Sequence, residues 1–342
     1  MLPFADILVI ASIATISPAK DAVVHVGAAG AAVQPPVKLE WSGTRAADGT
    51  FAETLLAVKP EGGERQVFSI TNAAEAYITN LELGRRYSWG VVVPGFGKGS
   101  ASSFETALEP PRLLRVEGLA NFRDLGGWVG LGGRRVRQNM LFRSAGLRAG
   151  ARRKGGSALS PVYEPGATNV TGLGLEYMRS EFRIRTDIEL RQREEAVLMQ
   201  DSLLGEDVSW LKVPFPAGAS IDDIVKGREP FMRIFRRLIR EDAYPAIFHC
   251  SDGCERTGTL ALLLNGLLGV SEEDLRRDWD FSSPALGLPN AGAESVEALL
   301  SYLHSVGGED VRECCEAFAR GCGVSDAEIE AFRAIMLEGG RG

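Results

Sequence analysis

The sequence predicts two domains, an all-β sandwich followed by an α/β domain whose central sheet is flanked by helices. Up to Thr106, short apolar runs recur at regular spacing between Gly, Asn and Asp turn signals, which is typical of a sandwich. Beyond Pro110-Pro111, strand-like runs alternate with helical stretches, which is typical of an α/β layer. The Pro-Pro pair is expected to form a stiff linker, so we place the domains at residues 1–109 and 110–342.

Six strand candidates build the first domain. They are residues 37–41, 54–58, 66–70, 76–81, 87–93 and 102–106. Leu81, Gly84 and Tyr87 follow one another at the spacing of a tyrosine corner. By these residues the domain resembles fibronectin type III and related modules, and the resemblance implies an immunoglobulin-like sandwich.

The second domain is expected to combine four strands with a set of helices. The strand candidates are residues 140–143, 184–190, 210–213 and 246–248, and the helix candidates are 231–240, 257–268, 294–305, 311–320 and 326–337. Ser271 and Ser325 begin capping-box patterns and mark two helix starts. Residues 150–174 are rich in Gly, Ser and Pro, with a basic cluster at 152–154, and we expect them to form an irregular surface loop, possible lid included.

Composition excludes several classes of protein. The 342 residues are 45% hydrophobic and 24% charged, as in ordinary globular chains, and no apolar run is long enough to span a membrane. The formal net charge of −7 disfavours a general nucleic-acid binder. All five cysteines lie at or beyond residue 250, without histidines at metal-ligand spacing. We therefore expect no disulfide scaffold, no metal and no cofactor.

The N-terminus has one apolar stretch, Ile7–Ala11. The residues before it include an acid and lack the Lys or Arg with which export signals begin. A first β-strand is favoured over an export signal, so we expect a cytoplasmic protein and keep export as the alternative.

The segment 246–268 carries the chemistry. A short buried-strand pattern runs into Cys250, and Arg256 follows after five intervening residues, just before an apolar helical run. A helix N-terminus binds oxyanions through its free N–H groups, and it lowers the pKa of a cysteine placed there. The planar guanidinium of Arg256 suits bidentate contact with phosphate. The sequence thus predicts a phosphate-binding loop that carries its own nucleophile.

Each residue of this loop receives an expected role. Cys250 is the nucleophile, Arg256 binds the phosphate, and His249 orients the loop without transferring protons. The remaining residues are expected to contact the phosphate: Ser251, Asp252, Gly253, Cys254, Thr257 and Gly258. The Thr257 hydroxyl is expected to donate a hydrogen bond to the Cys250 sulfur. The run His-Cys, five residues, Arg-Thr-Gly resembles the signature of the protein tyrosine phosphatase superfamily.

Two further segments narrow the resemblance. Residues 121–127 read Asn-Phe-Arg-Asp-Leu-Gly-Gly, and 141–145 read Leu-Phe-Arg-Ser-Ala, which is similar to the bacterial branch of tyrosine and lipid phosphatases. An Asp-Leu-Arg strand end followed by Glu, found in that branch, is matched loosely by residues 187–191 and Glu194. The resemblance covers 112–342 and implies metal-free hydrolysis of phosphotyrosine, phosphoserine/threonine or phosphoinositides. Arg123 and Asp124 are interpreted either as a structural ion pair under the loop or as part of the site.

The chain departs from that branch at two places. Cys254-Glu255 stands where many members have Lys-Asp, and the missing cation puts a preference for phosphoinositides in doubt. The strand end at residues 213–216 also lacks an acid. Asp222, Asp223 and Glu255 are therefore the candidates for general acid, and the two loop aspartates are favoured because a second negative charge inside the loop would repel phosphate.

The resulting prediction is a cysteine-dependent phosphomonoester hydrolase, most readily a protein-tyrosine or dual-specificity phosphatase. One alternative is a phosphoinositide or inositol-polyphosphate phosphatase. Two others lie outside enzymology: a pseudophosphatase that binds phosphorylated ligands, and an adhesion or scaffold protein that works through its sandwich. The expected partner is a phosphorylated protein or a phosphoinositide, with no nucleic acid and no membrane span.

Overall fold

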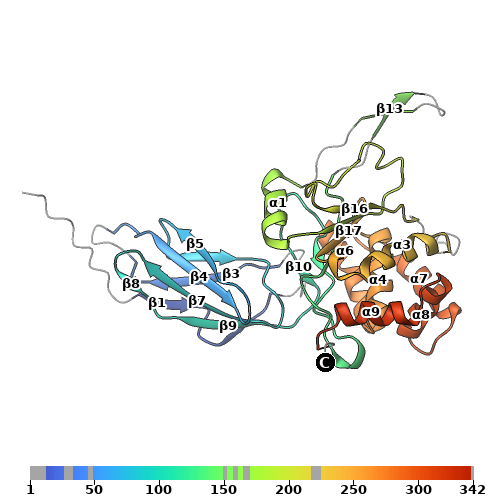
Figure 1. Ribbon diagram of the computed structural model, residues 1–342. Coiled ribbons are helices and arrows are strands. Elements are labelled where there is room, and N and C mark those ends of the chain that lie inside the picture. Colours follow the sequence, from blue (N-terminus) through green and yellow to red (C-terminus); the bar gives the residue numbers. More distant parts are fainter. Residues whose placement is uncertain are drawn as a thin grey trace, which may run out of the picture. The chain divides into compact units, whose positions relative to one another are not determined.

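The computed structural model describes residues 13–26, 34–44, 49–148, 152–156, 161–164, 170–216 and 225–339 (Figure 1). These residues fall into two compact units, one ending at Glu109 and the other beginning at Pro110. No helix within the described ranges is long and apolar enough to cross a membrane.

The first unit is a sandwich of two sheets. One sheet has the order β1 (Ala14–Ser17), β3 (Val37–Ser42), β6 (Glu75–Ile78). The other has the order β2 (Ala22–Val24), β9 (Ser102–Thr106), β7 (Arg86–Val93), β4 (Thr54–Pro60), β5 (Gln66–Ile70), with β8 (Gly97–Lys98) beside β7. The predicted immunoglobulin-like sandwich is confirmed, with two short strands, β1 and β2, added at its N-terminal side.

Alternation of buried and exposed side chains holds the two sheets together. Trp41, Leu56 and Phe104 point inward from three different strands and are fully buried. The Tyr87 hydroxyl accepts a hydrogen bond from the Glu82 N–H at 2.9 Å, which is the bond that defines a tyrosine corner. The spacing from Leu81 to Tyr87 had indicated this feature.

The second unit is built on a six-stranded sheet. Its order is β10 (Arg112–Leu113), β11 (Arg123–Asp124), β12 (Leu141–Ser144), β17 (Ala246–His249), β15 (Thr186–Glu189), β16 (Ser209–Lys212). The last four are parallel to their neighbours, and the first two are antiparallel. Strand β17 therefore lies inside the sheet, and its carboxyl end opens into the Cys250 loop.

Helices cover both faces of this sheet (Figure 1). On one face Phe248 packs in the large core formed with α3 (Arg228–Leu238), α4 (Glu255–Leu267), α5 (Glu272–Asp280), α7 (Ala293–Val306), α8 (Val311–Gly321) and α9 (Asp326–Met336). On the other face Ile247 joins a smaller cluster with Met178 and Phe182, which follow α1 (Gly172–Tyr177). Short α6 (Ser282–Leu286) follows α5. The predicted α/β layer is confirmed.

Local signals placed some boundaries well and others badly. Ser325 starts α9 with a complete capping box, as predicted, and the Ser271 hydroxyl caps α5. The irregular loop expected over 150–174 is wrong in part. Strands β13 (Arg152–Gly156) and β14 (Pro161–Glu164) pair as an antiparallel hairpin there, and α1 begins at Gly172. Turn-rich composition cannot exclude a hairpin, because two strands need only a short turn between them.

Candidate active site

The loop between β17 and α4 has the predicted strand–loop–helix order. Gly253 has a φ of +69°, and a Cβ there would collide with the Ser144 carbonyl oxygen, so only glycine fits. Helix α4 begins after Cys254 with no side-chain cap on its first N–H groups. Those N–H groups are therefore open to an oxyanion at this end of the helix.

The loop forms one side of a pocket of about 280 Å³. From the loop come Cys250, Ser251, Asp252, Cys254, Glu255 and Arg256, and from the segment after α6 come Leu286, Leu288, Ala291 and Gly292. Cys250 and Arg256 are both largely buried. The Trp279 indole N–H donates to the Gly292 carbonyl at 3.0 Å and anchors the second wall.

Arg256 is held by a carboxylate that sequence reasoning missed. Its two Nη atoms lie 2.6 and 3.0 Å from the Oε atoms of Glu195, and the Ser251 hydroxyl donates to the same carboxylate at 3.0 Å. Burial alone would raise the pKa of Glu195, but the bonds from Arg256 and the Gln192 N–H outweigh it and lower the pKa to about 2. Glu195 therefore stays ionised and fixes the plane of the guanidinium.

The available signal for this residue was one position off. The sequence comparison had pointed to Glu194 after the strand end at 187–191, but Glu194 is exposed and Glu195 turns toward the loop. Neighbouring glutamates in an irregular segment carry no periodicity that would distinguish them.

A buried charge cluster supports the loop from behind. Arg143 Nη1 and Arg123 Nε bind the two carboxylate oxygens of Asp278, at 2.6 and 2.8 Å. Arg143 Nη2 also donates to the Gly253 carbonyl at 2.8 Å, and the Asn121 amide donates to the Asp252 and Gly253 carbonyls at 3.0 Å. Held by their carbonyls from outside, these loop peptides can direct their N–H groups inward.

Arg123 and Asp124 have structural roles, but not as a pair with each other. Arg123 is fully buried on Asp278, whereas Asp124 binds Arg112 at 2.8 Å and accepts from the Gly126 N–H. Burial raises the pKa of Asp124 despite these donors. The motif therefore positions the sheet edge under the loop and does not face the pocket.

His249 lies beneath the loop in a second buried network. Its Nε2 lies 2.8 Å from Asp187 Oδ1, and its Nδ1 is 3.7 Å from Glu189 Oε2. Burial would lower the pKa of His249, but Glu189 and Asp187 together raise it. This placement suits a residue that orients the loop.

Other loop residues depart from their expected roles. The Thr257 hydroxyl is buried and has no hydrogen-bond partner within the described residues, so the predicted bond to the Cys250 sulfur is wrong. Gly258 does not line the pocket; a Cβ there would meet the Trp279 ring at 2.7 Å, so this glycine serves helix packing. The Cys254 thiol lies against Ser282, and burial raises its pKa.

The three candidate acids are placed unequally. Glu255 is exposed at the pocket and accepts a hydrogen bond from the Ser295 hydroxyl of α7 at 3.1 Å. Asp222 and Asp223 lie outside the described residues. Groups of metal-binding residues were also sought, and the described ranges contain none.

Comparison with known proteins gives the same assignment to this half of the chain. The sequence model described as tyrosine phosphatase family matches residues 114–160 and 166–338. A Cupriavidus necator relative that bears the name of a tyrosine-protein phosphatase is 29% identical over 187 residues, which are 47% of this chain and 60% of that protein. A Nostoc commune tyrosine-protein phosphatase is 23% identical over 203 residues, 46% of this chain and 67% of its own.

Solved structures give weaker matches. The catalytic core of the PP-IP phosphatase Siw14 from S. cerevisiae is 12% identical with a TM-score of 0.27, and the match covers 43% of this chain and 76% of that one. The chain spans about three fifths of the first curated relative and leaves the rest of that protein unmatched.

Proposed function

Since this chain belongs to the tyrosine phosphatase family, we propose that it hydrolyses phosphomonoesters through a cysteinyl-phosphate intermediate and that its substrates are phosphotyrosine-containing proteins. One observation carries the proposal. A single loop brings the Cys250 thiol, the Arg256 guanidinium and an uncapped helix N-terminus to the same pocket.

The reaction proceeds in two displacements at phosphorus. The Cys250 thiolate attacks, so an S–P bond forms while the P–O bond to the leaving group breaks, and an acid gives that oxygen its proton. Water then attacks the same phosphorus and transfers a proton to the former acid, and the thiolate departs with the S–P electron pair. Arg256 and the loop N–H groups stabilise the charge on the equatorial oxygens in both steps.

Glu195 leaves Arg256 able to do this. A guanidinium has five N–H donors, and the carboxylate engages one on each Nη atom. The ion pair fixes the direction of the fork while further donors remain for the phosphate.

The pocket favours an aryl phosphate over a polyphosphorylated ligand. Leu286, Leu288 and Ala291 give it an apolar wall, which suits an aromatic ring beside the phosphate. Arg256 is the one cation among its described lining residues, and Asp252 and Glu255 add negative charge. An inositol polyphosphate needs several cations to balance its phosphates, so phosphotyrosine is the better match.

A substrate panel tests this proposal. We expect turnover of a phosphotyrosine peptide to exceed that of a phosphoserine peptide and of an inositol polyphosphate, and Cys250→Ser to abolish all three. Preference for the inositol polyphosphate would favour the rival phosphatase class. Binding of the phosphopeptide without turnover of para-nitrophenyl phosphate would identify a pseudophosphatase and refute the proposal.

The general acid is proposed to be Asp222 or Asp223, with Glu255 as the alternative. Loss of the acid should slow an alkyl phosphate, whose leaving group is poor, more than an aryl phosphate with a good one. We therefore compare Asp222→Asn, Asp223→Asn and Glu255→Gln on both substrates. A selective loss in Glu255→Gln alone would reverse the preference, which its position at the pocket makes a direct competitor.

A further inference from the structure

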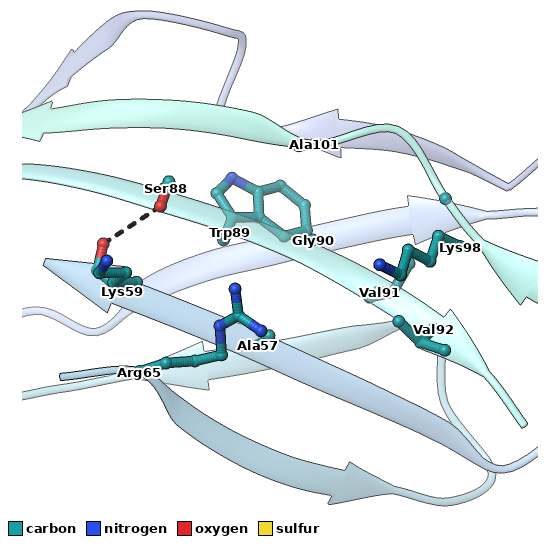
Figure 2. Close-up of a pocket in the computed structure, with 11 residues that line it drawn as sticks. Ala57, Lys59, Arg65, Ser88, Trp89, Gly90, Val91, Val92, Lys98 and Ala101 are labelled. Carbon is teal, nitrogen blue, oxygen red and sulfur yellow. Dashed lines mark hydrogen bonds between the residues drawn. The ribbon is translucent and has the colours of Figure 1, made fainter.

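A second hollow lies on the outer face of the larger sandwich sheet (Figure 2). It is a groove of about 210 Å³ across β4, β7 and the β8–β9 connection. Its lining residues are Ala57, Lys59, Arg65, Ser88, Trp89, Gly90, Val91, Val92, Lys98, Gly99 and Ala101. We call it the cationic groove.

The floor of the cationic groove is apolar and made of small side chains. Ala57 pairs with Gly90 across β4 and β7, and Ala101 lies beside Gly90. Val67 pairs with Ala57 on the edge strand β5 and is 56% exposed, so the apolar strip continues to the edge of the sheet. Small residues on a central strand pair leave space above the sheet that an incoming side chain can fill.

Three cations surround this floor without ion-pair partners. Lys59, Arg65 and Lys98 form no salt bridge to any described residue, whereas Lys38 and Arg86 of the same domain each do. Figure 2 shows Arg65 and Lys98 extending toward the groove from different sides. Glu61 and Glu64, in the turn between β4 and β5, do not line the groove.

Unpaired positive charge is concentrated here on a chain whose formal net charge is −7. Positive side chains around an apolar floor are complementary to a ligand with negative groups on either side of an aliphatic one. The volume is below that of a typical small-molecule site, so a few side chains of a larger partner fit better than a cofactor.

We propose that the cationic groove docks an acidic, extended segment of a partner protein. One aliphatic side chain of that segment rests on Ala57 and Gly90, and carboxylates before and after it approach Lys59, Arg65 and Lys98. Side chains two residues apart in an extended chain point to the same face, which gives the segment its spacing. Nucleic acid fits less well, because no exposed aromatic side chain lines the groove for bases to stack on.

Binding to the full chain tests the proposal. The probe is a fluorescein-labelled dodecapeptide of Glu with Leu at two central positions, followed by anisotropy, and the control peptide has Gln in place of every Glu. We expect the acidic peptide to bind more tightly than the Gln peptide and to weaken as NaCl is raised. The triple variant Lys59→Ala/Arg65→Ala/Lys98→Ala should lose on the order of tenfold in affinity, since each exposed pair contributes modestly.

Matched variants separate the groove from general charge. Lys20→Ala removes an exposed cation of the same domain outside the groove and should bind like wild type. Gly90→Val fills the floor without changing charge and should weaken the acidic peptide. Turnover of para-nitrophenyl phosphate should be the same in all these variants, which verifies folding independently of the groove.

Two results would overturn the proposal. One is equal affinity of the acidic peptide for wild type and the triple variant. The other is a groove-dependent preference for a DNA oligonucleotide or for anionic phospholipid vesicles over the peptide, which would assign the groove to a different class of partner.

Discussion

The catalytic pocket and the cationic groove are hollows of similar size built in opposite ways. In the pocket the guanidinium of Arg256 is fixed by Glu195, and the loop is braced by Arg143 on buried Asp278. In the groove Lys59 and its two neighbours have no ion-pair partner among the described residues. Chemistry requires donors held in one geometry, whereas docking tolerates flexible ones. Buried ion pairs therefore mark where this protein fixes geometry.

The largest effect should follow from removing the reacting groups of the pocket. Cys250→Ser should reduce phosphatase activity to background, because the alcohol is not ionised at neutral pH. Arg256→Lys should lower kcat by roughly 10²- to 10³-fold, since an ammonium cannot reproduce the bidentate fork. Steady-state assays with para-nitrophenyl phosphate measure both. Activity that survives Cys250→Ser would disprove the cysteinyl-phosphate mechanism.

The next effect concerns stability. Asp278→Asn leaves Arg123 and Arg143 buried without a counter-charge, so the free energy of unfolding should fall by about 3–5 kcal/mol. Asp274→Asn is the control on the same helix. It breaks a surface pair with Arg277 and should cost less than about 1 kcal/mol. Equal losses in urea titrations of the two variants would show that the buried cluster does not brace the fold.

Glu195 should matter for alignment more than for folding. Glu195→Gln keeps the shape but loosens Arg256, so kcat should fall by roughly 10-fold, with KM changed less. Glu194→Gln, at the exposed neighbour, should leave kcat unchanged. A loss of activity confined to Glu194→Gln would reverse our assignment of the two residues.

The same carboxylate gives a pH dependence with a defined sign. Because its folded pKa is about 2 and its ordinary value is 4.5, ionised Glu195 stabilises the folded protein above pH 4.5. This contribution should disappear as the pH falls from 4.5 toward 2. Thermal unfolding of wild type and Glu195→Gln should therefore converge at acid pH. Curves that stay parallel throughout this window would contradict the ion pair.

The smallest expected effect is that of removing the sandwich. A chain beginning at Pro110 should keep most of its activity toward a small aryl phosphate, because every described residue that lines the catalytic pocket lies beyond that point. It should lose the acidic peptide entirely. A folded, soluble truncated chain without phosphatase activity would show that the two regions are not independent.

Sequence alone was sufficient where the information is local. The strand running into Cys250, the five-residue gap to Arg256 and the helix behind it depend on neighbours in the chain, as do the tyrosine corner and the Ser325 cap. The division near Pro110 followed from a change in periodicity. Such patterns are visible because period and turn chemistry act over a few residues.

Tertiary structure decided what depends on distant partners. Glu195 and Asp278 lie far along the chain from the arginines they bind, and no local pattern selects them from other acids. The apolar wall at Leu286 and the unpaired state of Lys59 likewise became visible only once strands and helices were assembled. The side chain of Thr257 shows the converse, since its spacing indicated a bond to Cys250 that the fold does not form. Sequence determines which chemical groups are available, and packing determines which of them meet, because a charge finds its partner across space rather than along the chain.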